Sequence, residues 1–264
     1  ANIPRDNEYL GEDGLLHCTI CHGRKQTVVN FLGKERTVRC VCECHAEEER
    51  RHKERKQQEE IERRRRVCFQ DAKDVISWTF ANDDRHNPQL SDSMKQYAER
   101  FSEYRKNNNG LILYGDTGRG KTYLAACIAN AVIDMGYRVY MTNFSQAANN
   151  VQATWDKQEY IDTICGYDLL IIDDLGVERK SEYMQEIVYN IIDARYRKGG
   201  PIIITTNLTP DELNKPAEIG YARIYERLLE RCLPVKVDGI NRRRQKASQE
   251  WQTMRNQLGL EVKK

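Results

Sequence analysis

The chain has 264 residues, of which 39% are hydrophobic and 31% charged, and its formal net charge is +2. This length allows one full domain and a smaller one. Because the net charge is small, any attraction to nucleic acid has to come from local basic patches. No apolar run reaches the roughly 18 residues that a membrane span needs, and residues 1–10 lack the layout of a secretory signal. We therefore expect a cytoplasmic protein without membrane contact.

Three segments differ in composition. Residues 1–46 contain little continuous apolar sequence, and so short a segment needs a staple such as a metal ion to fold alone. Residues 47–68 are almost entirely charged, with mixed signs and no glycine or proline, which predicts a solvated helix that serves as a semi-rigid spacer. Residues 69–264 have the composition of an ordinary globular domain.

Strands and helices are expected to alternate in the third segment. Apolar runs predict strands at residues 111–114, 138–142, 168–172 and 201–206. Helical spacing predicts helices at residues 91–106, 122–135, 145–155, 159–165 and 182–197. Strands that are apolar on both faces and separated by helices indicate a parallel sheet flanked by helices. The predicted fold class is therefore α/β.

A phosphate-binding sequence follows the first predicted strand. Residues 115–122 read GDTGRGKT and fit the pattern GxxxxGK[ST] between a strand and a helix. The glycines let backbone N–H groups surround phosphate oxygens, and the next helix points its positive end at the same anion. Lys121 is expected to reach the β- and γ-phosphates and Thr122 to bind Mg²⁺; the alternative is a glycine-rich turn without a ligand. The expected nucleotide-binding residues are Gly115, Asp116, Thr117, Gly118, Arg119, Gly120, Lys121, Thr122 and Tyr123.

Two carboxylates follow the apolar run LLII later in the chain. Asp173 is expected to hold Mg²⁺ and Asp174 to polarise the attacking water as a general base, whereas the alternative is an Asp pair that caps the next helix. The spacing of Asp173 and Gly176 gives weak support to GTP, but no NKxD sequence that would read guanine is present, so ATP is the expected nucleotide. Asn207, after the last predicted strand, is placed either to orient water near the γ-phosphate or to form a turn.

A cluster of cysteines predicts a metal site in the first segment. The cysteines are Cys18, Cys21, Cys40, Cys42 and Cys44. A CxxC turn presents two sulfurs to one ion, and a tetrahedral zinc site needs four ligands. Additional candidate ligands are His17, His22 and His45. A redox CxxC normally lies beside a βαβ pattern, which this segment lacks, so we predict structural zinc on which the folding of residues 1–46 depends.

Several segments together resemble AAA+ ATPases of the DnaC/DnaI type, the bacterial and phage helicase loaders, to which the transposition ATPase IstB is closely related. The segments are GLILYGDTGRGKTYLA, YDLLIIDDLGVE, IIITTNL, RIYERLLERC and a G-x-N-R-R run, and the cysteine cluster matches too. The resemblance implies an AAA+ P-loop ATPase domain at residues 69–264, a charged linker helix at 47–68 and a zinc-binding, helicase-interacting domain at 1–46.

The resemblance also implies roles for single residues of the ATPase domain. Asn207 would be sensor 1, and Arg227 would be the arginine finger that reaches the γ-phosphate bound by a neighbouring subunit. Arg243 would be sensor 2, with the two adjacent arginines as alternatives. Many AAA+ proteins have Glu where this chain has Asp174, and the shorter side chain is expected to slow hydrolysis, which suits a switch more than a motor.

For the zinc site, the resemblance favours Cys42 and Cys44 beside Cys18 and Cys21, with Cys40 as the alternate ligand. The loaders have a CxC pair before an acidic–basic helix, and this chain has one before residues 47–68.

The function that the resemblance implies is that of an ATP-dependent loader in DNA replication initiation, within a primosome. The loader would hold a DnaB-type replicative helicase through the zinc module, self-associate through its AAA+ domains and place the helicase on single-stranded DNA. Basic stretches at residues 63–66, 195–198 and 242–246 are either solvated faces or part of that DNA contact. The alternatives are an IstB-like transposition helper and a regulator that binds nucleotide without hydrolysing it; the intact phosphate-site residues argue against the regulator.

Overall fold

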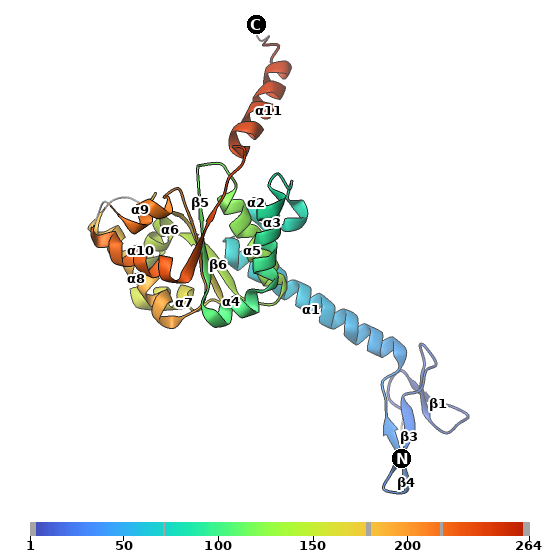
Figure 1. Cartoon of the computed structure of the whole chain (residues 1–264). Coiled ribbons are helices and arrows are strands. Elements are labelled where there is room, and N and C mark those ends of the chain that lie inside the picture. Colours follow the sequence, from blue (N-terminus) through green and yellow to red (C-terminus); the bar gives the residue numbers. More distant parts are fainter. Residues whose placement is uncertain (1–3, 71, 178–180, 217–218, 261–264) are drawn as a thin grey trace. The chain divides into compact units, whose positions relative to one another are not determined.

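The computed structural model describes residues 4–70, 72–177, 181–216 and 219–260. The chain divides into two compact units, residues 1–62 and 63–264. The charged segment is helical: α1 (Glu43–Phe69) begins inside the CxC pair, four residues before the predicted start, and continues into the second unit (Figure 1). Within the described residues, none of the helices combines the length and the apolar character required to cross a bilayer.

The first unit contains two small antiparallel sheets, each of two strands, and the first part of α1. The strands are β1 (Glu8–Leu10), β2 (Leu16–Cys18), β3 (Gln26–Phe31) and β4 (Lys34–Arg39). The buried apolar side chains of this unit are few, namely Leu16, Cys18 and Cys42 among the described residues. So small a core fits the expectation that the segment needs a metal ion to fold.

A five-stranded parallel sheet forms the centre of the second unit, in the order β6-β7-β8-β5-β9. Its strands are β5 (Gly110–Tyr114), β6 (Val139–Asn143), β7 (Leu169–Leu175), β8 (Ile202–Thr206) and β9 (Cys232–Lys236). The side chains of β7 from Leu169 to Ile172 are fully buried, because helices cover both faces of the sheet. The predicted α/β fold is confirmed.

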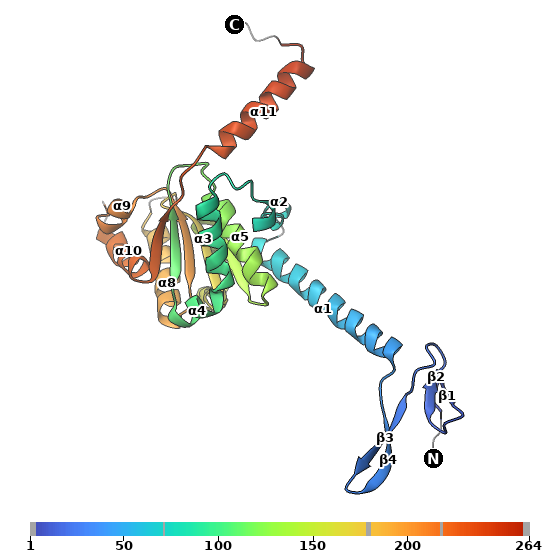
Figure 2. The same ribbon diagram turned by 45° about the vertical axis from the view of Figure 1, so that its right-hand side comes forward.

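Helices lie on both faces of this sheet (Figures 1 and 2). One face is covered by α5, which packs against α2 and α3, and the other by α6, α7, α8 and α10. The helices of the second unit after α1 are α2 (Lys73–Ile76), the 3₁₀ turn η1 (Phe80–Asn82), α3 (Pro88–Glu99), α4 (Phe101–Asn107), α5 (Lys121–Asp134), α6 (Phe144–Ala153), α7 (Lys157–Cys165), α8 (Glu182–Lys198), α9 (Pro210–Asn214), α10 (Ile219–Arg231) and α11 (Arg242–Gln257).

Two sequence predictions about these elements were wrong. The single helix predicted at residues 91–106 is two helices, because the backbone at Arg100 ends α3 and begins α4. Met94, Tyr97, Ala98 and Phe101 are all buried and keep a helical spacing across this break, which hides it in the sequence. Strand β9 was missed, since its sequence CLPVK contains a proline and only its first residue, Cys232, is buried in this outermost strand of the sheet.

Strand β7 extends three residues beyond its predicted end, to Leu175, and its pairing with β8 shifts register between Ile172 and Leu175. The two aspartates therefore lie within the irregular end of a central strand. Because all five strands are parallel, the segments that follow β5, β7 and β8 meet at the carboxyl-terminal end of the sheet. The phosphate-binding loop, the aspartate pair and Asn207 lie on these segments.

Candidate functional site

The loop between β5 and α5 has a backbone that only its glycines allow. Gly115, Gly118 and Gly120 have φ values of 141°, 83° and 99°, a region that side chains with a Cβ rarely occupy. A Cβ on Gly118 would also lie 2.3 Å from the Oδ1 atom of Asn241. The glycines that predicted a phosphate loop are therefore required by their positive φ values and, at Gly118, also by the lack of room for a Cβ atom.

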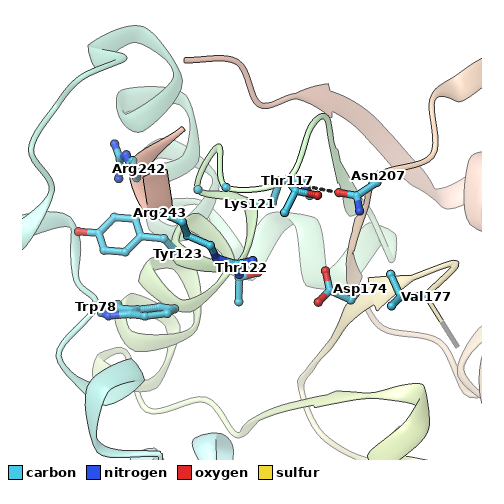
Figure 3. Close-up of a pocket in the computed structure, with 12 residues that line it drawn as sticks. Trp78, Thr117, Lys121, Thr122, Tyr123, Asp174, Val177, Asn207, Arg242 and Arg243 are labelled. Carbon is cyan, nitrogen blue, oxygen red and sulfur yellow. Dashed lines mark hydrogen bonds between the residues drawn. The ribbon is translucent and has the colours of Figure 1, made fainter. Parts of the chain in front are cut away.

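Lys121 begins helix α5, and its side chain points back across the loop. Its Nζ atom donates to the carbonyl oxygens of Gly115 at 2.8 Å and Asp116 at 3.0 Å, and to Asn207 Oδ1 at 2.7 Å (Figure 3). The residue is only 5% exposed. Burial lowers the pKa of this amine, and the negative charge of Asp174 opposes the shift. The structure thus brings together the predicted phosphate-binding lysine and the asparagine predicted to act as sensor 1.

Thr122 and Asp173 meet in the geometry of a magnesium site. The Thr122 hydroxyl lies 2.9 Å from Asp173 Oδ1, which also accepts a 2.5 Å hydrogen bond from Thr205. Neighbouring ligands of an octahedral Mg²⁺ ion lie about 3 Å apart when each bond is about 2.1 Å. Burial raises the pKa of the Asp173 carboxyl, although the Thr205 hydroxyl favours the ionised form. These two oxygens fit adjacent positions around one ion.

Asp174 has a left-handed backbone with φ of 58°, which is uncommon outside glycine but tolerated by aspartate. Its N–H donates to the hydroxyl of Thr205 at 2.9 Å. At this irregular end of β7, the Asp174 side chain faces the same cavity as Lys121 and Asn207 (Figure 3). The strand pattern did not indicate this local strain, which lies where a polar side chain has to face a ligand.

The cavity beside the loop has a volume of about 510 Å³, within the usual range for ligand sites. Its lining residues are Trp78, Thr117, Gly118, Gly120, Lys121, Thr122, Tyr123, Asp174, Val177, Asn207, Arg242 and Arg243. The rings of Trp78 and Tyr123 lie 5.7 Å apart. Trp78 and Val177 were not predicted as site residues, because a residue before β5 and one after the aspartates reach the cavity only through the fold.

The start of helix α11 closes one side of this cavity. The guanidinium of Arg242 lies 2.6 Å from Asp84 Oδ1, 3.6 Å from Asp83 Oδ1 and 5.4 Å from the centre of the Tyr123 ring. Arg243 also lines the cavity, whereas Arg244 does not. The lining therefore does not distinguish Arg243 from Arg242, and the sensor 2 role of Arg243 stays a prediction.

Arg227 does not line the cavity. It lies on α10, where it forms an ion pair with Asp193 and its guanidinium lies 5.3 Å and 5.5 Å from the ring centres of Tyr189 and Tyr196. An arginine finger acts on the nucleotide of another subunit, so a position away from this chain's own cavity is compatible with that predicted role.

The basic stretches have different environments. Arg195 is 3% exposed and donates to four backbone carbonyls, including those of Cys165 and Pro201, so it serves the fold and cannot reach DNA. Arg65 is hydrogen-bonded to Asn130 and Asp134. In the stretch 242–246, the side chain of Lys246 lies outside the described residues.

The predicted zinc ligands come together in the first unit. The sulfurs of Cys18, Cys21, Cys42 and Cys44 all lie within 4.8 Å of one another. Tetrahedral zinc with bonds of about 2.3 Å separates its sulfur ligands by about 3.8 Å, so this donor set fits the ion. The N–H groups of Cys21 and Ile20 lower the pKa of the Cys18 thiol to about 6, which favours the thiolate that metals bind.

The alternate ligand lies apart from this group. The Cys40 thiol donates to the carbonyl oxygen of Arg24 at 3.4 Å and does not belong to the cluster. His17 is hydrogen-bonded to Asp13 and to the His22 carbonyl, so it is not a ligand in this arrangement. Zinc at the four grouped cysteines stays a prediction, with a geometry that suits it.

Comparison with known proteins agrees with this site. Residues 25–250 match the family described as IstB-like ATP binding protein. The chain belongs to the IstB-like ATP-binding family. The expected AAA+ P-loop fold and the assignment to ATP-binding proteins are thereby confirmed.

Proteins similar to this chain include named helicase loaders. The replicative helicase loader DnaI of Bacillus subtilis (strain 168) is 27% identical over 186 residues, which cover 65% of this chain and 60% of DnaI. The loader DnaC of Escherichia coli (strain K12) is 29% identical over 126 residues, 46% of this chain and 50% of DnaC. This IstB-like chain therefore spans between half and 60% of the length of these relatives.

A relative named for an insertion sequence and two solved structures are also similar. A putative insertion sequence ATP-binding protein of Sinorhizobium fredii is 32% identical over 108 residues, 40% of this chain and 36% of that protein. The crystal structure of DnaI matches with a TM-score of 0.55 at 27% identity, and the match covers 64% of this chain and 92% of the chain in that crystal structure. The DnaC helicase loader matches at a TM-score of 0.53 and 20% identity over 63% of this chain and all of that one, which shows the shared fold.

Proposed function

We propose that this IstB-like chain is an ATPase that loads a ring-shaped, DnaB-type replicative helicase onto single-stranded DNA. The observation that carries the proposal is the meeting of four side chains at one sheet edge: Lys121 with Asn207, and Thr122 with Asp173. This arrangement has the parts that phosphoryl transfer needs, a phosphate-binding lysine and paired metal ligands. The named loaders among its relatives support the choice of substrate.

Each side chain of the cavity has a proposed role in hydrolysis. Lys121 and the loop N–H groups would bind the β- and γ-phosphates, and Thr122 and Asp173 would hold Mg²⁺, which would neutralise developing charge. Asp174 faces the cavity and accepts the proton of the attacking water. Asn207 orients that water. Trp78 and Tyr123 offer aromatic faces on which a purine base can stack.

Coupling to assembly is proposed to come from arginines. Arg243 of the same chain would contact the γ-phosphate as sensor 2, while Arg227 of a neighbouring copy would complete the site in trans. A site completed by a second subunit hydrolyses ATP only in the assembled form. The zinc module would hold the helicase while the ATPase domains assemble on single-stranded DNA, which they would contact mainly through its phosphates.

A loading assay tests the proposal. The purified chain, the replicative helicase of its own organism, ATP and a closed single-stranded DNA circle are mixed, and helicase retained on the circle is measured. We expect ATP-dependent loading that is lost in Lys121→Ala, while that variant still binds the helicase. Failure of the wild-type chain to bind ATP, or equal loading by Lys121→Ala, would contradict the proposal.

The second candidate is an IstB-like transposition helper. It is supported by the family match and by the 32% identity to the insertion sequence protein. The loader is favoured by the longer match to DnaI, over 186 residues, and by the cysteine cluster on a charged helix. If the chain recruits a transposase to DNA and does not bind a ring helicase, the transposition helper becomes the preferred function and the loader the second candidate.

A further inference from the structure

The turn between β3 and β4 contains a leucine, Leu32, whose backbone conformation is unfavourable for a bulky residue and whose apolar side chain is exposed to solvent. Phe31 pairs with Lys34, so Leu32 and Gly33 form a two-residue turn, with φ values of 53° and 74°. Such turns have positive φ at both central residues and prefer Asn-Gly. Leu32 is 89% exposed. A bulky aliphatic residue in this conformation is an outlier, and strain of this kind persists mainly where it serves a function.

The face behind this turn is also apolar. In an antiparallel ladder, directly paired residues and every second residue share a face, so Val29, Phe31 and Val38 lie on the same side of the hairpin. All three are exposed, Phe31 by 59%. The base of the hairpin is anchored at Gln26, which is buried and accepts a hydrogen bond from the Leu16 N–H, and at Arg39, which forms an ion pair with Glu8. Among the described residues, nothing covers the apolar face.

The charges on this face are basic. Lys34 and Arg36 pair with Phe31 and Val29 and share their side of the sheet, and the Arg36 guanidinium lies 6.0 Å from the centre of the Phe31 ring. The acid of the hairpin, Glu35, pairs with Asn30 and so belongs to the opposite face. An apolar tip with a basic border complements an apolar pocket bordered by carboxylates. A phosphate backbone would match the charges but offers no pocket for the leucine.

We infer that Leu32 and Phe31, bordered by Lys34 and Arg36, insert into an apolar, acid-rimmed pocket on the partner helicase. The identity of this partner rests on the proposed function, whereas the surface and its complement come from the hairpin. A small number of buried apolar anchors commonly supplies most of the binding energy of a protein interface. The strained turn is then the anchor of the contact, and burial of Leu32 in the pocket offsets the free-energy cost of exposing this side chain in a strained turn.

The substitution Leu32→Asn separates this role from a structural one. Asparagine suits the turn and removes an exposed apolar group, so the full chain should keep its zinc content and ATP hydrolysis, and its Tm should stay equal or rise. Affinity for the purified ring helicase, measured by calorimetry, should fall by about tenfold or more. Leu10→Asn is the matched control, since Leu10 is an exposed leucine of β1 in the same unit and should leave affinity unchanged.

The charged border has its own test. Exchanging Lys34 and Arg36 for glutamate should also weaken binding, and added salt should weaken the wild-type complex but have little further effect on this variant. Binding by Leu32→Asn as tight as that of the wild type would overturn the hairpin contact and leave the loader proposal standing. A wild-type chain that binds no helicase would overturn both.

Three further outcomes would overturn the inference. Loss of binding together with a lower Tm or zinc content would give Leu32 a structural role. If light scattering shows that Leu32→Asn abolishes self-association of the chain, the occupant of the face is a second copy. Weakened binding to single-stranded DNA, with helicase affinity unchanged, would assign the hairpin to nucleic acid.

Discussion

The Asn241 side-chain amide donates a hydrogen bond to the carbonyl oxygen of Thr117 at 3.0 Å. The Oδ1 atom of the same side chain accepts a hydrogen bond from the Arg244 N–H at 3.0 Å and so caps helix α11. The backbone N–H of the following residue, Arg242, donates to the carbonyl oxygen of Gly118 at 3.0 Å. The start of α11 is therefore fixed directly to the phosphate loop. This contact holds the helix that carries Arg243 beside the nucleotide cavity.

Substitution of Asn241 should uncouple this helix from the loop. Asn241→Asp keeps an oxygen that caps α11 but cannot donate to Thr117, whereas Asn241→Ala loses both contacts. Because one hydrogen bond contributes about 0.5–1.5 kcal/mol, we expect ATP affinity to fall by about threefold to tenfold in either variant, with a further loss of helix stability of about 1 kcal/mol in the alanine variant. A fluorescent ATP analogue measures affinity, and tryptic cleavage at the α11 arginines measures helix order. Wild-type affinity in Asn241→Asp would show that the amide contact is dispensable.

Asn207 should matter for hydrolysis more than for binding. Its Oδ1 atom lies 2.7 Å from Lys121 Nζ, and the residue lines the cavity in which water would be oriented. Asn207→Ala should lower the rate of ATP hydrolysis by about 100-fold, the usual effect of removing one polar group that acts on the transition state, and change the Kd for ATP by less than about tenfold. Single-turnover hydrolysis and equilibrium binding measure the two effects. The opposite pattern, weak binding with normal turnover, would remove Asn207 from the sensor role.

Much of this site could be predicted from sequence because its chemistry follows strands with continuous apolar runs. The runs before Gly115 and Asp173 marked buried parallel strands, and parallel strands bring their carboxyl ends to one edge. Trp78 reaches the cavity and Asn241 reaches the phosphate loop from segments far away in sequence, so no local pattern indicated them. The positive φ of Asp174 depends on its register with β8, which a single strand does not encode.

The first unit was less predictable. Cysteine spacing indicated a metal site, but the choice among Cys40, Cys42 and Cys44 depends on where the chain turns into α1, and that helix begins at Glu43. The hairpin was missed, because β3 and β4 are short, exposed strands without regular alternation of apolar and polar residues. The preference for Cys42 and Cys44 over Cys40 came from the resemblance to the loaders.

Ionised Asp173 is expected to destabilise the folded chain in the absence of nucleotide. Burial raises its pKa above the usual value of 3.8, so the protonated form stabilises the fold, and this contribution is lost as the pH rises through the pKa of the folded state. Asp173→Asn keeps an oxygen for Thr122 and Thr205 without the charge. Its Tm should exceed that of the wild type at neutral pH, and the difference should shrink towards pH 4.

The same substitution should abolish metal-dependent hydrolysis. Loss of a carboxylate ligand should lower turnover by about 100-fold or more, so Asp173→Asn is expected to be more stable and nearly inactive. Thermal unfolding across pH and ATPase assays with varied Mg²⁺ measure both effects. If Asp173→Asn lowers the Tm at neutral pH, the ionised carboxylate stabilises the fold and this explanation is wrong.

Cysteine substitutions should distinguish the zinc ligands. Cys42 is buried, and its sulfur lies 3.5 Å from that of Cys44, whereas the Cys40 thiol is hydrogen-bonded to a backbone carbonyl outside the cluster. Cys42→Ser should lose the metal and, with it, the fold of the first unit. Cys40→Ser should retain one zinc per chain, since the four grouped thiols of the cluster already complete a tetrahedral site.

Elemental analysis of the purified full-length variants gives the metal content, and limited proteolysis of residues 1–62 reports the fold of the first unit. A chelator should make the wild-type unit as sensitive to protease as Cys42→Ser, while ATP binding by the second unit persists because its core is built from its own sheet and helices. Zinc loss in Cys40→Ser with retention in Cys42→Ser would exchange the two assignments. A wild-type chain that contains no metal and still resists protease would show that the four thiols pack as ordinary buried groups.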